Sequence, residues 1–385
     1  MATRSAIVIG AGIVGLAMAR ALALRGYAVT VVERNGRSVG ASIRNFGMIW
    51  PVGQPDGPLY ERALHSRSIW KEISAEAKIW HEEKGSLHLG YEQEEMKVLM
   101  ELQEIYAHRN YRIMKPVEID AVNDGIVTKG LLGGLYSPEE MVVDPRQAMY
   151  LLPGLLMEKY RVKFKWNTTI SNIIHPHVYS GGQAYSADEI WICSGSDFET
   201  LYPEIYRNSP ITKCKLQMLR TRAQPAGWQP GPSVCGGLSL LHYHSFREAA
   251  SWNSCNELLK LKYPRHLECG VHVMISQNEN GEITIGDSHE YGLVHDPFTR
   301  EEINELILGY LARFVRLKDP FISERWNGFY AKLTDGSTEF VHEATEGVTI
   351  VNGLGGAGMT LSFGLCDEIA SGNYMPTASI KQSAG

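Results

Sequence analysis

The sequence predicts an α/β fold, and three observations carry this prediction. Residues 5–33 read as a short apolar strand, a glycine-rich turn, an apolar helix and a second strand. Segments 213–223, 269–277 and 281–288 are bounded by turn residues and rich in strand formers, whereas 94–109 has helical spacing. Near the C-terminus, the glycine cluster NGLGGAGMTLSFG at 352–364 leads directly into the helix-like LSFGLCDEIA.

Length and composition bound the class of protein. A chain of 385 residues is long enough for two domains, or for one composite unit with a large core. The net charge of −6 gives no general attraction to nucleic acid. The six cysteines form no C-x-x-C pair, so we expect neither a disulfide framework nor a structural zinc site, and we predict a cytoplasmic protein. Glycines and an arginine interrupt the apolar N-terminus, which argues against a signal peptide or a membrane span.

The N-terminal turn carries the spacing of a dinucleotide-binding site. Gly10, Gly12 and Gly15 form G-x-G-x-x-G between the predicted strand and helix. In this motif the first glycine permits the turn, the second lets the backbone approach a pyrophosphate, and the third lets helix and strand pack closely. The helix N-terminus attracts phosphate, and Glu33 ends the second strand, where a carboxylate can bind ribose hydroxyls. The motif alone leaves NAD and FAD open.

The remaining segments favour FAD through a resemblance that spans nearly the whole chain. In order, these are VGASIRNFGMIWP, VDPRQAMYLL, NTTISNI, ADEIWICSGSD, KLQMLRT, ERWNGFYAKLTD and the terminal glycine cluster. The chain therefore resembles the D-amino-acid-oxidase-like flavoenzymes, the group that holds glycine oxidase and sarcosine oxidase. Within that group, SIRNFGMIWP, KLQMLRT and GDSHEYG look most like oxidases of aminophosphonate catabolism.

The resemblance implies two interleaved domains. A Rossmann-type FAD-binding domain would comprise residues 1–80, 139–210 and 325–385. An α+β substrate domain, built on an antiparallel sheet that covers the flavin, would comprise 81–138 and 211–324. The terminal loop and helix would lie against the pyrimidine end of the flavin ring, where helix-end donors stabilise negative charge.

The resemblance and the N-terminal motif together give an expected FAD-binding set. No Cys or His stands where some relatives tether the flavin, so noncovalent FAD is expected. The set is Gly10, Gly12, Ile13, Val14, Gly15, Glu33, Arg34, Ser42 (on a phosphate), Arg44, Asn45, Phe46, Gly47, Ile170, Cys193, Ser194, Gly195, Arg325, Gly328, Gly355, Gly356, Gly358, Met359 and Thr360.

The chain departs from its relatives at two substrate anchors. Amino-acid oxidases of this group usually carry W-x-G-x-R-P, whose Arg binds the substrate carboxylate, but here Tyr330 and Ala331 follow the glycine and phenylalanine. Thr360 stands where sarcosine oxidases have a carboxylate-binding Lys. The loss of both anchors argues against a simple α-amino acid as substrate.

Other cationic and hydrogen-bonding side chains are candidates for replacing those anchors. His242 and His244 stand two apart, so on a strand both would point to one face, and the same spacing joins Lys213, Lys215 and Gln217. Several such donors together suit a dianionic group. A metal site at the His242/His244 pair is less favoured, because no carboxylate or thiolate partner is evident in the sequence. The predicted catalytic and substrate-binding residues are Tyr330, Arg44, His242, His244, Lys215 and His272, with Arg325 and Lys332 as further donors.

These features predict an FAD-dependent oxidase of a small amine, with O2 as the second substrate. The resemblance implies N-methylated or 1-hydroxylated 2-aminoethylphosphonate. The alternatives are an amino-acid or N-methyl amino-acid oxidase, a dehydrogenase that passes electrons to a carrier, an FAD-bound assembly or tRNA-modifying protein, and an NAD-dependent dehydrogenase. The sequence does not indicate an oligomeric state.

Overall fold

A six-stranded sheet forms one half of the molecule. The computed structural model describes residues 3–377, and in it the strand order is β20-β21-β13-β1-β2-β9. All neighbours are parallel except β20 and β21. The strands are β1 (Ser5–Ile9), β2 (Ala28–Val32), β9 (Lys163–Lys165), β13 (Glu189–Ile192), β20 (Phe340–Thr345) and β21 (Val348–Asn352). The N-terminal strand–helix–strand prediction is confirmed, with the helix as α1 (Ile13–Leu24).

A nine-stranded sheet forms the other half. Its order is β18-β14-β17-β16-β15-β5-β7-β6, and β19 pairs along β14. Only β15 and β5 are parallel. The strands are β5 (Ser86–Gly90), β6 (Arg112–Met114), β7 (Gly133–Ser137), β14 (Ile211–Ala223), β15 (Ser233–Cys235), β16 (Met274–Gln277), β17 (Glu282–Gly286), β18 (Glu290–Gly292) and β19 (Ile322–Leu333). The fold class expected from the sequence, with a parallel sheet and a largely antiparallel one, is confirmed.

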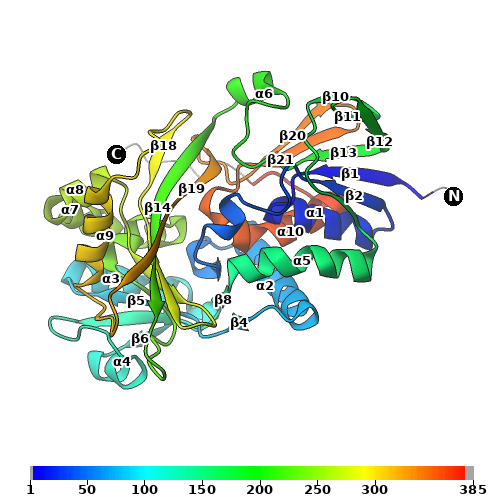
Figure 1. The fold of residues 1–385 in the computed structure, drawn as a ribbon. Helices are drawn as coiled ribbons and strands as arrows, with labels where there is room; N and C mark the ends of the chain where they lie inside the picture. Colours follow the sequence, from blue (N-terminus) through cyan, green and yellow to red (C-terminus); the bar gives the residue numbers. More distant parts are fainter. Residues whose placement is uncertain (1–2, 378–385) are drawn as a thin grey trace.

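Helices cover both sheets (Figure 1). On the side of the parallel sheet, α10 packs against α1 and α2, and α5 packs against the same pair. The remaining helices of five residues or more lie with the nine-stranded sheet, except for α6. Besides α1, the helices are α2 (Pro58–Ala77), α3 (Gln93–Ile105), α4 (Pro116–Val122), α5 (Pro145–Tyr160), α6 (Pro203–Arg207), α7 (Trp252–Lys262), α8 (Pro264–Glu268), α9 (Glu301–Leu311) and α10 (Gly358–Ala370).

Two small sheets complete the strands. One has the order β10-β11-β12 and the other β3-β8-β4. Their strands are β3 (Met48–Ile49), β4 (His81–Glu82), β8 (Met141–Val143), β10 (Asn172–Ile174), β11 (His177–Ser180) and β12 (Gln183–Ser186). Within residues 3–377, no helix combines the length and the apolar character needed to cross a bilayer.

Strands β14 and β19 are the longest in the fold and run side by side between the two halves (Figure 1). Their antiparallel pairing extends from Ile211↔Leu333 to Thr221↔Ile322. The predicted domain boundary at residue 211 coincides with the start of β14. The one at residue 325 falls inside β19, which belongs to the nine-stranded sheet and precedes β20 and β21 of the six-stranded sheet.

The prediction of a strand around His242 and His244 is wrong. Residues Gly237–Leu241 (η4) and His244–Glu248 (η5) are short 3-10 helices, and His242 donates its backbone N–H to Ser239 O. Alternating leucines imitate a strand here, but Leu238 and Leu240 are both buried in the core of this half. Glycine at position 236 lets the Tyr310 ring pack against the backbone here, because a Cβ would stand 2.7 Å from that ring.

Candidate active site

The glycine motif is shaped as the sequence predicts. Gly10 has φ +106°, and a Cβ there would collide with the carbonyl of Cys193, the residue after β13. A Cβ at Gly15 would collide with the Gly10 carbonyl, so this glycine lets α1 pack against the turn. A Cβ at Gly12 would meet only the Ser42 hydroxyl, 3.3 Å away, among the described atoms. The second glycine therefore faces open space, as close approach of a pyrophosphate requires.

A cavity of about 390 Å³ lies over this turn. Glu33 borders it, accepting hydrogen bonds from the Ala11 N–H at 3.0 Å and the Asn35 N–H at 2.9 Å. Ser42 accepts one from the Ile13 N–H at 2.9 Å, in the first turn of α1. The predicted residues on the wall are Gly10, Gly12, Ile13, Val14, Glu33, Arg34, Ser42, Arg44, Ile170, Cys193, Ser194, Gly195, Gly355 and Gly358. The prediction missed Asn35, Ser38, Thr168 and Asn352, although Asn35 and Ser38 lie within five residues after Glu33.

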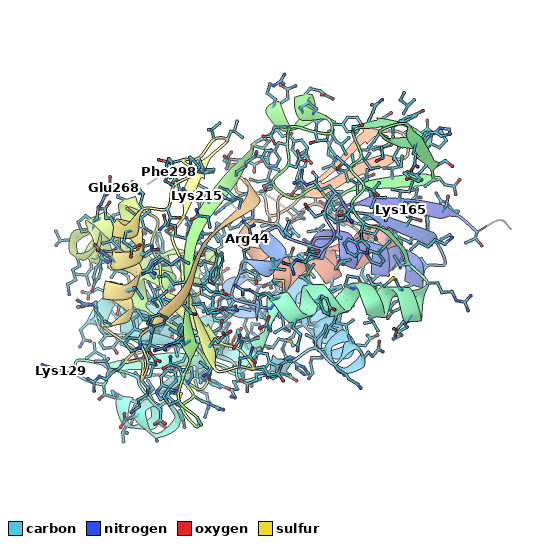
Figure 2. All side chains as sticks on the ribbon, in the orientation of Figure 1. Arg44, Lys129, Lys165, Lys215, Glu268 and Phe298 are labelled. Atoms are coloured by element: carbon cyan, nitrogen blue, oxygen red, sulfur yellow. The ribbon has the colours of Figure 1, made fainter. Side chains whose placement is uncertain are left out.

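A second cavity, of about 240 Å³, adjoins the first. Arg44 and Tyr330 border both cavities, and Figure 2 shows Arg44 between the two halves of the molecule. The guanidinium of Arg44 donates to Asn327 O at 3.1 Å. A dinucleotide in the first cavity would therefore present its reactive ring toward the second. The expected cofactor residues Asn45, Phe46, Gly356, Met359 and Thr360 lie on the second wall.

Four residues of the expected FAD-binding set border neither cavity. Gly15 and Gly47 allow close backbone packing instead, and a Cβ at Gly328 would stand 2.6 Å from the Leu216 side chain. Arg325 is exposed and donates to Glu301 at 3.2 Å, so its predicted place at the cofactor is wrong. Arg325 belongs to the part of β19 that lies beyond the cavities.

Lys215 also lies away from both cavities. Its Nζ donates to Asp296 O at 2.6 Å and Phe298 O at 3.1 Å, and Figure 2 shows Lys215 beside Phe298. Residues alternate between the faces of a strand, and β14 presents Leu216 and Met218 to the second cavity. The sequence analysis correctly placed Lys215 on a strand and on one face with Lys213 and Gln217. It wrongly expected that face to meet the substrate, because the opposite face of β14 borders the cavity.

The wall of the second cavity holds a cluster of titratable groups, of which the sequence analysis named His242 and His272 as candidates for one site but missed Asp287 and His289. His242, His272 and His289 have ring nitrogens within 4.8 Å of one another, and we call these rings with Asp287 the histidine cluster. Asp287 lies 3.2 Å from Nε2 of His272 and 3.8 Å from Nε2 of His289. His244 borders the same cavity outside the cluster. Asp287 and His289 stand two apart after β17 in GDSHEYG, and that spacing was the available signal for them.

The cluster is poorly satisfied by the protein itself. His272, Asp287 and His289 are 5%, 6% and 8% exposed. Nε2 of His272 and Oδ1 of Asp287 lie 3.2 Å apart but not in hydrogen-bonding geometry, so these two atoms and Nδ1 of His272 have no hydrogen-bond partner among the described residues. His289 is held at Nδ1 by Gly270 O, 3.1 Å away. Unpaired buried polar atoms are costly, so this arrangement suits a wall that meets a polar ligand.

Burial sets the charge of this wall. It lowers the pKa of His289 to about 4 and the pKa values of His242 and His272 well below their ordinary value, with neighbouring rings adding to the effect for those two. Burial raises the pKa of Asp287 well above that of an ordinary aspartate. It also lowers the pKa of Lys332. The cluster therefore favours uncharged imidazoles and a proton-bearing carboxyl.

The cluster does bring a carboxyl next to histidines, which the sequence reasoning about metals did not find. The rings of His242 and His272 are stacked, with centroids 4.0 Å apart and 28° between planes. A bound ion would have to lie in both ring planes at about 2.0–2.1 Å from each nitrogen. Planes at this separation and tilt do not meet so near the rings. The stacked geometry does not form a metal site, and the absence of a metal stays a prediction.

Tyr330 and Thr360, the two residues that replace the expected carboxylate anchors, both border the second cavity. Tyr330 comes from β19 and is half-buried, and desolvation of its hydroxyl raises its pKa well above that of an ordinary tyrosine. Lys332, two residues along the same face, contacts the Tyr291 hydroxyl at 3.2 Å. The Thr360 hydroxyl accepts from the Trp50 N–H at 3.0 Å, which ties α10 to the cavity wall.

The turn, the cavity over it and the adjoining substrate cavity define a dinucleotide-dependent enzyme. Residues 5–371 match the family described as FAD dependent oxidoreductase, and the chain belongs to that family. FAD is therefore its cofactor, and the open glycine cradle, Ser42 and Glu33 fit the pyrophosphate and a ribose. When bound there, FAD would supply the electron acceptor for oxidation of a substrate.

Relatives and solved structures agree with this membership. The D-amino acid dehydrogenase of Paramagnetospirillum magneticum is 26% identical over 273 residues, which cover 54% of this chain and 64% of that protein. The chain spans less than two thirds of the length of the curated relatives it matches. The L-proline dehydrogenase of P. horikoshii matches with a TM-score of 0.76 and 20% identity, covering 96% and 92% of the two chains. Glycine oxidase of Bacillus cereus matches at 0.75 and 16%, covering 97% and 96%. These structures share the fold.

Replacing Glu33 by Ala should weaken FAD binding. Charge-assisted hydrogen bonds contribute about 1.5–3 kcal/mol, so a loss of roughly tenfold to a hundredfold in affinity is expected. FAD titration of apoprotein, followed by flavin fluorescence, measures it. Glu33→Gln keeps an acceptor oxygen and should lose less. Acid precipitation should release intact FAD from both proteins. Equal affinity in the Ala variant would remove Glu33 from the ribose, and flavin in the precipitate would refute noncovalent binding.

Proposed function

We propose that the protein oxidises a small amine that carries a phosphonate group, with N-methylated or 1-hydroxylated 2-aminoethylphosphonate as the substrate class. The hydride would leave the carbon next to the nitrogen for FAD, and water would hydrolyse the resulting imine to an aldehyde and an amine or ammonia. O2 would then take two electrons and two protons to give H2O2. Six buried free cysteines suit a reducing cytoplasm.

One observation carries the phosphonate proposal. Next to the cofactor cavity, several imidazoles and the amine of Lys332 share one wall with Tyr330. By the resemblance of ERWNGFYAKLTD, Tyr330 would stand where amino-acid oxidases carry a carboxylate-binding arginine. A phosphonate offers three oxygens to such donors, whereas a carboxylate is matched by a single bidentate guanidinium. The resemblance of SIRNFGMIWP, KLQMLRT and GDSHEYG supports the same substrate class.

The named relatives favour a second candidate. They include a D-amino acid dehydrogenase and an L-proline dehydrogenase, so oxidation of an amino acid with transfer of electrons to a carrier is the alternative. In that case Arg44, on the wall shared by both cavities, would be the available guanidinium for the carboxylate.

Flavin bleaching without oxygen separates the two candidates. The panel is glycine, sarcosine, D-alanine, L-proline, 2-aminoethylphosphonate, and its N-methyl and 1-hydroxy derivatives. Rapid bleaching by an aminophosphonate and slow bleaching by every amino acid is the expected result. The reverse order would overturn the substrate class. Peroxide formed in air then distinguishes O2 from a dye or quinone as acceptor.

A further inference from the structure

We propose that the histidine cluster is an oxyanion subsite that takes up a proton from solvent when the anionic end of the substrate binds. The inference rests on the proposed function and extends it, because Asp287 and His289 become binding groups and substrate affinity becomes coupled to pH. The cluster residues are His242, His272, His289 and Asp287.

The geometry suits one anion with several oxygens. The ring of His272 lies 4.0 Å from that of His242 and 5.0 Å from that of His289, between centroids, and His242 and His289 are 4.7 Å apart. Three imidazole edges are therefore available within the width of one phosphonate and its hydrogen bonds. His272 holds two unpartnered nitrogens and is 5% exposed, so it has donor capacity that the protein does not use.

Charge balance requires a proton. The four groups carry no net charge whether all are neutral or Asp287 has passed its proton to a ring. An entering dianion therefore meets little compensating charge from the cluster, and a buried unpaired charge is strongly unfavourable. An anion in contact favours the charged form of an imidazole. Proton uptake by one ring supplies the missing charge.

The other groups around the cluster leave room for this uptake. From β19, Tyr330 and Lys332 face it, and from β18 Tyr291 does. Tyr330 is half-buried and Tyr291 half-exposed; desolvation of their hydroxyls raises both phenol pKa values, so they stay neutral, and burial lowers the pKa of Lys332. The remaining titratable or charged neighbours are Tyr243, His244, Arg247 and Cys214, with Arg44 on the cofactor side of the cavity.

The sign of the pH dependence follows. Burial lowers the pKa of free His289 to about 4, so the free ring is neutral at pH 7. Bound anion raises the ring pKa. Between these two values the affinity for an anion that does not itself titrate falls by about tenfold per pH unit for one proton. With an unperturbed histidine, the anion affinity would begin to fall near pH 6.5. In this protein the affinity begins to fall at a lower pH, because burial lowers the pKa of the free rings.

Calorimetry on the holoenzyme tests the proton directly. Methylphosphonate and methanesulfonate are titrated at pH 7 in two buffers that differ in protonation enthalpy; neither probe has an amine to oxidise. The sulfonate stays a monoanion, so any proton taken up comes to the protein. About one proton per bound sulfonate is expected, from the linkage relation. Equal binding enthalpies in the two buffers, or no binding of either anion, would overturn the inference.

Variants assign the proton to the cluster. His272→Gln should lose most of the uptake and bind methylphosphonate at least about tenfold more weakly. The matched control is His266→Gln, which removes an imidazole of the same half outside both cavities and should behave as wild type. Asp287→Asn mimics the proton-bearing carboxyl and should retain the uptake. Should His272→Gln not fold, His289→Gln takes its place, with the flavin spectrum as the folding check. Unchanged uptake in the folded histidine variant, or lost uptake in Asp287→Asn, would refute the assignment.

Two outcomes separate this inference from the proposed function. If aminophosphonates are turned over and anions bind without proton uptake, the proposed function stands and the proton-uptake proposal is wrong. If anions bind with proton uptake but no aminophosphonate is turned over, the proton-uptake proposal stands and the proposed function is wrong. Zinc is a third test: one equivalent of Zn²⁺ bound by chelator-treated holoenzyme, and lost in His272→Gln alone, would make the cluster a metal site and overturn the proposal.

Discussion

Gly15→Ala is expected to remove FAD from the protein. The new Cβ would collide with the Gly10 carbonyl, and both atoms belong to the tightly packed turn, so no side-chain rotation relieves the clash. Overpacking of this kind costs about 1–3 kcal/mol or more, and here the strain falls on the turn that receives the pyrophosphate. The ratio of flavin to protein absorbance after desalting, together with a thermal melt, measures both losses.

Gly309→Ala is the matched control. Gly309 is exposed in α9, and a Cβ there would meet nothing within 4 Å among the described atoms. Alanine in a helix interior is about 1 kcal/mol more favourable than glycine, so this variant should be slightly stabilised with full FAD content. If Gly15→Ala retained as much flavin as Gly309→Ala, the close packing of α1 against the turn would not be needed for binding.

Tyr330→Arg is expected to exchange the substrate class. The guanidinium would enter the second cavity from β19 and could bind a carboxylate bidentately, if Tyr330 corresponds, as the resemblance implies, to the arginine of amino-acid oxidases. We expect kcat/KM on glycine or sarcosine to rise by about tenfold or more, the effect of one added charge-assisted pair. Activity on an aminophosphonate should fall, because the longer side chain crowds its cavity.

The control for this exchange is Tyr330→Phe, which removes the hydroxyl and adds no charge. It should give no gain on any amino acid. Steady-state kinetics on both variants, with glycine, sarcosine and N-methyl-2-aminoethylphosphonate, provide the comparison. An arginine variant that gains nothing would mean that β19 does not correspond to the anchor strand of the amino-acid oxidases.

The parts of the site that the sequence predicted are local. Gly10, Gly12, Gly15 and Glu33 lie within one strand–helix–strand unit, so their spacing in sequence determines their spacing in space. The terminal glycine cluster and α10 follow the same logic. A resemblance in the order of motifs supplied the partner segments that local reasoning cannot place.

The histidine cluster was beyond local reasoning because it is assembled from separated segments. His242 ends a 3-10 turn, His272 precedes β16, and Asp287 and His289 follow β17. Nothing in any one segment indicates that the others lie beside it. Lys215 shows a second difficulty: strand periodicity tells which residues share a face but not which face meets the cavity, since that depends on what packs on either side.

Strand β19 has a consequence for how this protein can change its specificity. Phe329 and Ala331 border the cofactor cavity, while Tyr330 and Lys332 border the substrate cavity, Tyr330 reaching both. Along residues 329–332 of this strand, the odd-numbered side chains therefore line the cofactor cavity and the even-numbered ones line the substrate cavity. Except at Tyr330, a substitution in this part of the strand changes the lining of one cavity only. Insertion or deletion of a single residue earlier in the strand would turn each of these side chains to the other face, so the residues that line the two cavities would change places. Divergence of substrate preference along this strand is therefore confined to replacement of residues, with its length held constant.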